Sequence, residues 1–377
     1  MSAPLLICSK SAWQPSIRRE HALARLAAAH GHRVTFLERP LDVRALRSAA
    51  GARAWVTALR ARSADAGAHA RGEPGVSVQP QATILPGHLN GLAELTGNAL
   101  LRRGIASAGE RATVVVNVPW QWPATSVHRG RRVFDCADDW SALMTHRSDR
   151  LGDLFRRIGS EADAVVLASP SLAERFPAPR AVVVRNGVSE EMLVPPSTGV
   201  PPPARMLHAG TLTPRFDARL AGAVLERLPE WTLDLYGQCQ YPECGERPGP
   251  ELQWLLSRHG PRVRWHGVLP RAALAQAIDS ATVAVVMNRP EQSLGQDSMK
   301  LYDYAARGTP IVTTAISSDL DAGGPPHLYV RDGPAELADA VLAASAEPRE
   351  WREERRRWAE AQRWEARWPA WSAALFG

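Results

Sequence analysis

Residues 283–314 read VAVVMNRPEQSLGQDSMKLYDYAARGTPIVTT, and this stretch decides the fold. The apolar run Val283–Met287 has the length and valine content of a strand buried in a parallel sheet. After a polar loop, Met299–Gly308 has the apolar spacing of a short helix that ends at glycine, with Pro310 just beyond it. Residues 311–314 begin the next strand. This order predicts a parallel α/β unit whose helix begins at the carboxyl edge of the sheet.

The start of this helix carries residues suited to phosphate chemistry. The first amides of a helix have no intrahelical acceptor, so they bind phosphate groups at that edge. Lys300 lies in the first turn and is one of only two lysines in the chain, the other being Lys10. A compact ammonium at this place favours a diphosphate. The alternative is an ordinary capped helix between two strands.

The segment Lys300–Val312, KLYDYAARGTPIV, resembles the donor-binding segment of retaining, family 4-type glycosyltransferases with the GT-B fold. The resemblance implies two Rossmann-like α/β domains, each with a doubly wound parallel sheet, that face each other across a cleft. It also implies a nucleotide-sugar donor. In such enzymes the acid at the position of Asp303 binds the ribose hydroxyls. The resemblance implies that Lys300 and the backbone at Ser298 and Met299 hold the diphosphate.

Other motifs of the second half fit the same resemblance. The resemblance implies that the donor binds on the loops that follow three strands, which here carry Gly210 and Thr211, then Gly237, then His266 and Gly267. Cations on the first of these loops contact the donor diphosphate, and we assign this role to Arg215, whose guanidinium can bind a diphosphate bidentately. The segment Arg185–Val188 (RNGV) matches a family turn, for which a plain turn is the alternative.

In the first half, residues 133–140 read VFDCADDW and resemble a phrase found in a bacterial, teichuronic-acid-type branch of these enzymes. Three carboxylates in five residues after a strand exceed what helix capping needs. We therefore take Asp138 and Asp139 as candidate catalytic residues that contact sugar hydroxyls of donor or acceptor. For one of the two, a helix cap is the alternative. Lys10, Arg18 or Arg19 borders the acceptor or the diphosphate, or lies on the surface.

The chain of 377 residues has the length of about two domains. Residues 194–203 (VPPSTGVPPP) read as a linker. We expect an acceptor-side domain at 1–193, a nucleotide-sugar-binding domain at 204–350, and a terminal helix at 351–377. That helix resembles the one that returns to the first domain in GT-B enzymes.

Alternating strands and helices are predicted on both sides of the linker. The expected strands are 5–8, 34–38, 113–118, 132–134, 164–168, 181–184, 206–209, 232–236, 263–265, 283–287 and 311–314. The expected helices include 17–30, 54–66, 218–228, 271–280 and 351–376, and residues 72–78 are expected to form a loop.

Composition indicates an ordinary soluble protein, with 45% hydrophobic and 22% charged residues. No apolar run approaches a membrane span and no signal peptide is visible, so we expect a cytoplasmic location. The four cysteines are too few and too scattered for a disulfide framework, and we expect free thiols. The net charge of +6 suits a basic cleft and a weak peripheral contact with anionic membranes. Because the arginines are spread along the chain, we expect no nucleic-acid partner.

The sequence departs from the family at Gly295, where typical members have an acid near the donor sugar. Sugar specificity therefore cannot be transferred. We predict a hexosyltransferase that uses a UDP-, dTDP- or GDP-sugar, needs no cofactor or metal, and acts on a cell-envelope glycan or a secondary metabolite. Two alternatives stay open: a nucleotide-sugar 2-epimerase of GT-B architecture, and a degenerate chain that binds sugar nucleotides without turnover. The sequence leaves the oligomeric state open.

Overall fold

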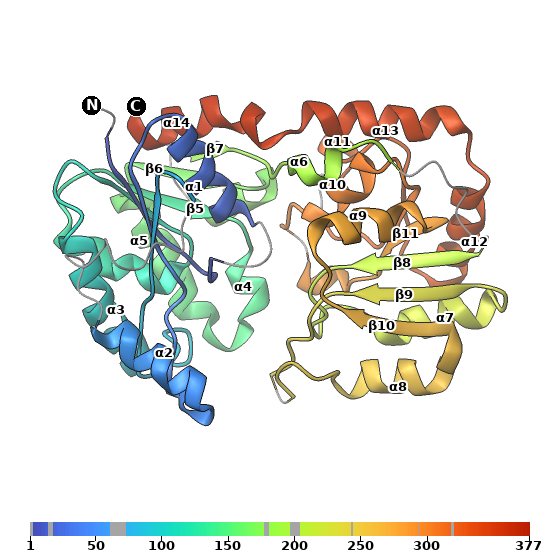
Figure 1. Cartoon of the computed structure of the whole chain (residues 1–377), viewed down its shortest axis with the longest axis horizontal. Coiled ribbons are helices and arrows are strands. Elements are labelled where there is room, and N and C mark those ends of the chain that lie inside the picture. The colour runs from blue at the N-terminus through green and yellow to red at the C-terminus, as the bar shows by residue number, and fades with distance from the viewer. Residues whose placement is uncertain are drawn as a thin grey trace. The chain divides into compact units, whose positions relative to one another are not determined.

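The computed structural model divides the chain into two compact units. Unit 1 comprises Met1–Arg185 and Arg367–Gly377, and unit 2 comprises Asn186–Ala366 (Figure 1). Residues 186–193, which the sequence boundary assigned to the first domain, group with unit 2, as do residues 351–366. The structure describes residues 3–13, 18–60, 73–176, 181–196, 204–242, 244–293, 295–317 and 320–377. Most of the expected linker, residues 197–203, lies outside this set.

Unit 1 is built on a seven-stranded, wholly parallel sheet in the order β3-β2-β1-β4-β5-β6-β7. The order reverses beside β1, as in doubly wound folds. The strands are β1 (Leu5–Cys8), β2 (Val34–Leu37), β3 (Val76–Gln79), β4 (Thr113–Val116), β5 (Arg132–Cys136), β6 (Ala164–Leu167) and β7 (Ala181–Val183). The helices are α1 (Arg19–Ala29), α2 (Ala49–Arg60), α3 (Gly91–Ala106), α4 (Trp140–Leu143), α5 (Ser148–Glu161) and α14 (Trp368–Phe376), with short 3-10 segments η1 (Val43–Arg47), η3 (Pro119–Val127), η4 (Thr145–Arg147) and η5 (Pro170–Arg175).

Unit 2 has a six-stranded parallel sheet in the order β10-β9-β8-β11-β12-β13. The strands are β8 (Arg205–Ala209), β9 (Thr232–Tyr236), β10 (Val263–Gly267), β11 (Val283–Val286), β12 (Ile311–Thr313) and β13 (Leu328–Val330). The helices are α6 (Glu190–Leu193), α7 (Ala218–Arg227), α8 (Pro250–His259), α9 (Arg271–Asp279), α10 (Met299–Ala306), α11 (Leu320–Gly323), α12 (Pro334–Ser345) and α13 (Arg349–Ala361), with η6 (Gly260–Arg262), η7 (Pro290–Gln292) and η8 (Trp364–Arg367) as 3-10 segments.

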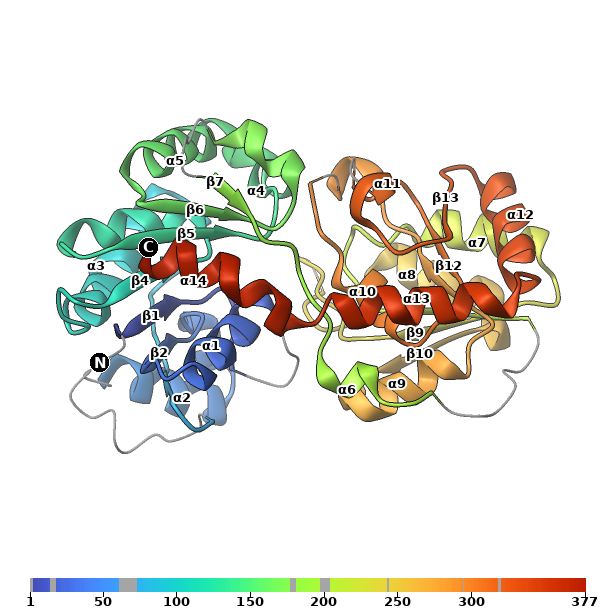
Figure 2. The ribbon, with the colours of Figure 1, turned by 90° about the horizontal axis from the view of Figure 1, so that it is seen from above.

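Apolar side chains are buried on both faces of each sheet, which is why the central strands read as continuous apolar runs. All four residues of β1 and all four of β11 are buried. In unit 2, one face of the sheet packs against α7, α8 and α12, and the other packs against α9, α10 and α13 (Figure 2). The predicted fold class, two Rossmann-like parallel-sheet domains, is confirmed.

Three local predictions were wrong. Residues 76–79 pair with β2 as strand β3, where a loop was expected. Helix α3, which the sequence pattern did not predict, contributes Leu101 and Ile105 to the core. The expected single helix at 351–376 is interrupted, because α13 ends at Ala361 and α14 begins at Trp368. No helix within the described ranges is long and apolar enough to cross a membrane.

Candidate active site

The start of α10 is fixed to the end of β8 by a buried tyrosine. The phenol oxygen of Tyr304 accepts a hydrogen bond of 2.7 Å from the backbone N–H of Ala209. Burial raises the pKa of Tyr304, so its phenol stays neutral. One turn earlier, the side chain of Lys300 passes over Gly210. A Cβ at Gly210 would lie 2.2 Å from Lys300 Cε, so only glycine leaves room for this lysine.

Glycines also bring the ends of β8, β9 and β10 close together. The Gly210 N–H donates to the Tyr236 carbonyl at 2.8 Å, and the Gly237 N–H donates to the Gly267 carbonyl at 2.7 Å. A Cβ on Gly237 would lie 2.0 Å from the carbonyl oxygen of Gly210. The three glycines have φ of +147°, +135° and +71°, a region that favours glycine. This part of the sheet edge is therefore lined by backbone.

Two cations meet beside this edge. Lys300 and Arg215 are half-buried, and neither forms an ion pair with an acidic side chain among the residues that the structure describes. Burial, and then repulsion from Arg215, lower the pKa of Lys300 to about 8. Below them on β8, burial and the Lys300 charge lower the pKa of His208 to about 3. His208 is therefore neutral, with Nδ1 3.1 Å from the Val285 carbonyl oxygen.

The first amides of α10 lie beside these cations. The Ser298 side chain occupies the N-cap position but makes no capping hydrogen bond. The backbone N–H groups of Met299 and Lys300 are thus without an intrahelical acceptor. Two unpaired cations and a helix N-terminus together provide more positive potential than one carboxylate would balance. The arrangement suits a ligand with several negative charges, such as a diphosphate.

The loop before α10 is held by the RNGV segment. Asp297 accepts from the Asn186 backbone N–H at 2.5 Å and from the Tyr302 hydroxyl at 2.9 Å, and its carbonyl accepts from Asn186 Nδ2 at 2.6 Å. The sequence predicted a turn at Asn186. These contacts make Asn186 and Asp297 positioning residues for the α10 N-terminus. Gly295, in that loop, has φ of +85°, which favours glycine over a residue with a carboxylate.

Asp303 has a partner that the sequence did not predict. Arg271 on α9 donates to both carboxylate oxygens of Asp303, at 2.8 and 2.9 Å, and also donates to Ser189 Oγ at 2.7 Å. Because these residues are far apart along the chain, no local pattern reveals the pair. A carboxylate can accept about four hydrogen bonds, so capacity for a ribose hydroxyl remains.

His266 is also held by a neighbouring strand. Its Nε2 lies 2.5 Å from Asp234 Oδ1, and its ring stacks on Tyr236 with centroids 4.6 Å apart. Asp234 accepts in addition from Arg205 Nε at 2.5 Å. Thr211, directly after Gly210, is half-buried at the same edge.

The two predicted acids of unit 1 have different surroundings. Asp139 caps α4, accepting from the backbone N–H groups of Ser141 and Ala142 at 3.0 and 3.3 Å, and it also pairs with Arg175 at 3.1 Å. The capping alternative therefore applies to Asp139. Asp138 forms an ion pair of 2.6 Å with Lys10, and both side chains are partly exposed at the ends of β5 and β1.

Asn117 Oδ1 and Gln121 Oε1 are buried and have no hydrogen-bond donor within the described ranges. Arg19, in contrast, is buried against Asp135 and serves the core. The described residues contain no cluster of three or more His, Cys, Asp or Glu arranged to hold a metal ion.

Comparisons with known proteins agree with this geometry. Sucrose-phosphate synthase from Thermosynechococcus elongatus is similar over 99% of this chain and 98% of its own, with 17% identity and a TM-score of 0.77. HepE from Anabaena, solved with UDP and glucose, is similar over 99% and 100%, with 15% identity and a TM-score of 0.72. Trehalose 6-phosphate synthase from Burkholderia multivorans is similar over 99% of this chain and 98% of its own, with 11% identity and a TM-score of 0.68.

At these identities the solved structures establish the fold alone. The sequence has no significant match among curated proteins. Residues 208–347 match the family model described as Glycosyl transferases group 1. These residues include Lys300, Arg215 and the three strand-end glycines, so the match to this family model contains the candidate site, within a chain of GT-B fold.

Proposed function

We propose that this protein is a retaining glycosyltransferase that moves a hexose-type sugar from a nucleotide diphosphate sugar to a hydroxyl acceptor. The observation that carries the proposal is the pair of unpaired cations, Lys300 and Arg215, at the uncapped start of α10. A nucleotide diphosphate supplies the anion that this site lacks. HepE was solved with UDP and glucose, which makes UDP-glucose the first donor to test.

The chemistry follows from where charge develops. When the sugar leaves, negative charge grows on the diphosphate, and Lys300, Arg215 and the amides of Met299 and Lys300 stabilise it. In a retaining reaction of this kind, the leaving diphosphate takes the proton of the acceptor hydroxyl on the same face of the sugar. The site therefore needs no nucleophilic side chain and, in this proposal, no metal.

We assign the acceptor to unit 1. Asp138 provides acceptors and Lys10 provides donors for hydroxyl groups, and both side chains are partly exposed. The resemblance of residues 133–140 to the teichuronic-acid-type branch favours a cell-envelope glycan over a secondary metabolite.

The test combines a thermal-shift screen of UDP-, dTDP- and GDP-sugars with a turnover assay on the best donor. Proton NMR of the product then reports whether the anomeric configuration is retained. Lys300→Met should abolish most turnover, whereas Arg264→Met, which removes an exposed cation from β10, should not. A donor that is epimerised without an acceptor, or bound without any hydrolysis or transfer, would overturn the proposal.

A further inference from the structure

Helix α3 presents an unusual exposed face. Leu92 and Leu95 are 69% and 70% exposed, and their spacing places them side by side on one face. Arg102 and Arg103 are exposed further along the helix. The only acid of α3, Glu94, is buried.

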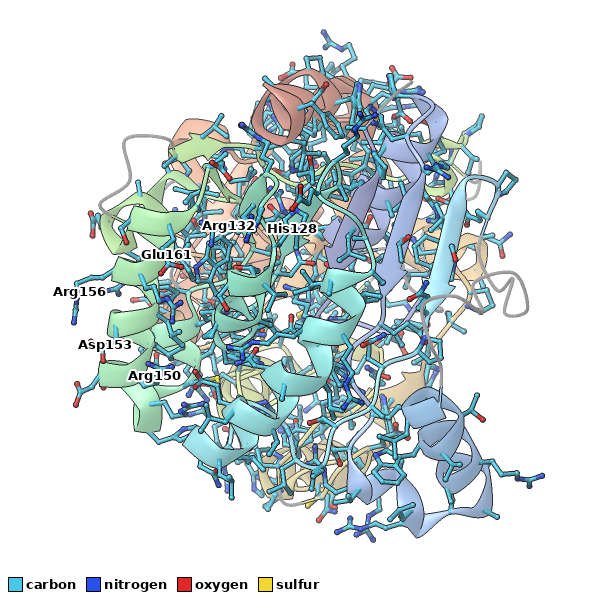
Figure 3. All side chains as sticks on the ribbon, turned by 90° about the vertical axis from the view of Figure 1, so that its left-hand side faces the viewer. His128, Arg132, Arg150, Asp153, Arg156 and Glu161 are labelled. Atoms are coloured by element: carbon cyan, nitrogen blue, oxygen red, sulfur yellow. The ribbon has the colours of Figure 1, made fainter. Side chains whose placement is uncertain are left out.

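Two arginines of a neighbouring region neutralise that acid. Glu94 accepts from Arg147 at 2.8 Å and also pairs with Arg150 on α5. The outer face of α3 is therefore apolar and cationic, with no exposed carboxylate. The outer face of α5 differs, because it pairs charges of both signs, as Arg156 does with Asp153 at 2.5 Å (Figure 3). Mixed charges of that kind are typical of a surface that faces water.

The segments next to α3 have the same character. Between Val43 and Arg60, which form η1 and α2, the sequence contains no acid at all. Hydrogen bonds join this region to the chain before α3: Val43 N–H donates to the Ile84 carbonyl at 3.2 Å, and Trp55 Nε1 donates to the Thr83 carbonyl at 2.9 Å. We call the following exposed residues the basic apolar surface: Leu46, Arg47, Arg53, Leu59, Ile84, Leu89, Leu92, Leu95, Arg102 and Arg103.

We propose that the basic apolar surface docks unit 1 on an anionic lipid bilayer. Its apolar side chains are spread singly over helices and loops among arginines. Protein interfaces instead place their anchors in packed pockets. A fluid bilayer interface accepts scattered leucines, while arginines remain at the level of the lipid phosphates, which they bind bidentately. The absence of exposed acids on this surface gives the charge complementarity with anionic headgroups.

Cosedimentation with vesicles tests the proposal. The full chain should bind vesicles of phosphatidylcholine with 30% phosphatidylglycerol at least about tenfold more tightly than vesicles of phosphatidylcholine alone, because each arginine near an anionic surface adds attraction. Arg102→Gln with Arg103→Gln should weaken binding by about tenfold or more. Leu92→Gln with Leu95→Gln should also weaken it by about tenfold or more, because less apolar area is buried.

Leu342→Gln is the matched control, since Leu342 on α12 is 48% exposed and lies outside this surface. It should bind vesicles as the unchanged chain does. Circular dichroism and thermal unfolding verify that each variant folds. Equal binding to both kinds of vesicle, or binding that the α3 variants leave unchanged, would overturn the proposal. A dimer seen by sedimentation velocity and lost in the leucine variant would also overturn it, because a second copy would then cover the surface.

Discussion

Lys300→Met separates the charge of this residue from the packing of its stem. The stem lies over Gly210, and an unbranched methionine fills much of the same space. Because burial and repulsion from Arg215 outweigh the attraction of Asp303, the charge of Lys300 is unfavourable until a donor binds. We therefore expect the substitution to stabilise the free protein while it disables the enzyme, which is a known trade-off at functional sites.

The size of this stabilisation follows from the pKa of Lys300, which falls from 10.5 to about 8. At 1.36 kcal/mol for each unit, charging Lys300 in the folded protein costs roughly 3 kcal/mol. The unfolded chain binds this proton more tightly, so the penalty is fully present below pH 8 and fades as the pH rises to 10.5. At pH 7 we expect Lys300→Met to raise the free energy of unfolding by about 1–3 kcal/mol. Each kcal/mol should raise Tm by about 2–4 °C.

Activity should change in the opposite direction. Loss of a charge-assisted contact to the leaving diphosphate costs about 2–4 kcal/mol of transition-state stabilisation, or about 30- to 1000-fold in kcat/KM. Calorimetry without donor at pH 7 and at pH 10 measures the stability gain, which should be smaller at the higher pH. A Tm that falls, or an unchanged kcat/KM, would refute the reasoning. Arg264→Met, which removes an exposed cation, should change neither Tm nor kcat/KM.

Three further outcomes are expected. Donor affinity measured by calorimetry should weaken as the pH rises through about 8, where Lys300 loses its proton, and a flat profile would contradict this. Gly210→Ala should lower kcat/KM by about a hundredfold, because the new Cβ displaces Lys300. Gly245→Ala is its control: it adds a side chain at φ of +65° with nothing within 4 Å, so equal losses of activity would show that strain alone is responsible. Asp303→Asn and Arg271→Met should both lower Tm, because each breaks the ion pair between them. If Asp303 binds ribose, only Asp303→Asn should raise the donor KM. Equal KM values in the two variants would exclude that contact.

The sequence predicted the elements whose signal lies within one short segment of chain. Apolar runs such as Val283–Val286 identify buried strands, because a strand covered on both faces has little choice of residue. Helix α3 escaped prediction because Leu92 and Leu95 point outward while Glu94 is buried, which reverses the usual pattern of an amphipathic helix. Strand β3 lies at the edge of its sheet and has only four residues.

The candidate site could be predicted only in part for a related reason. Lys300 stands in a motif that a reader of the sequence can find. Its contact with Gly210, like the pair of Arg271 with Asp303, joins positions that only the folded chain brings together. A pattern in one segment carries no information about such partners.

The division of unit 1 into two stretches of chain has a consequence for biosynthesis. Helix α14 completes unit 1, since the Leu375 carbonyl accepts from Thr113 Oγ1 at 3.0 Å and the Arg19 guanidinium lies over the Trp371 ring at 4.8 Å. All of unit 2, residues 186–366, leaves the ribosome before α14 does. An N-terminal domain usually folds first during synthesis, but unit 1 can complete its packing only after all of unit 2 has been synthesised. Until α14 arrives, the nascent chain exposes the apolar surface that this helix later covers, and chaperones have that interval in which to bind it.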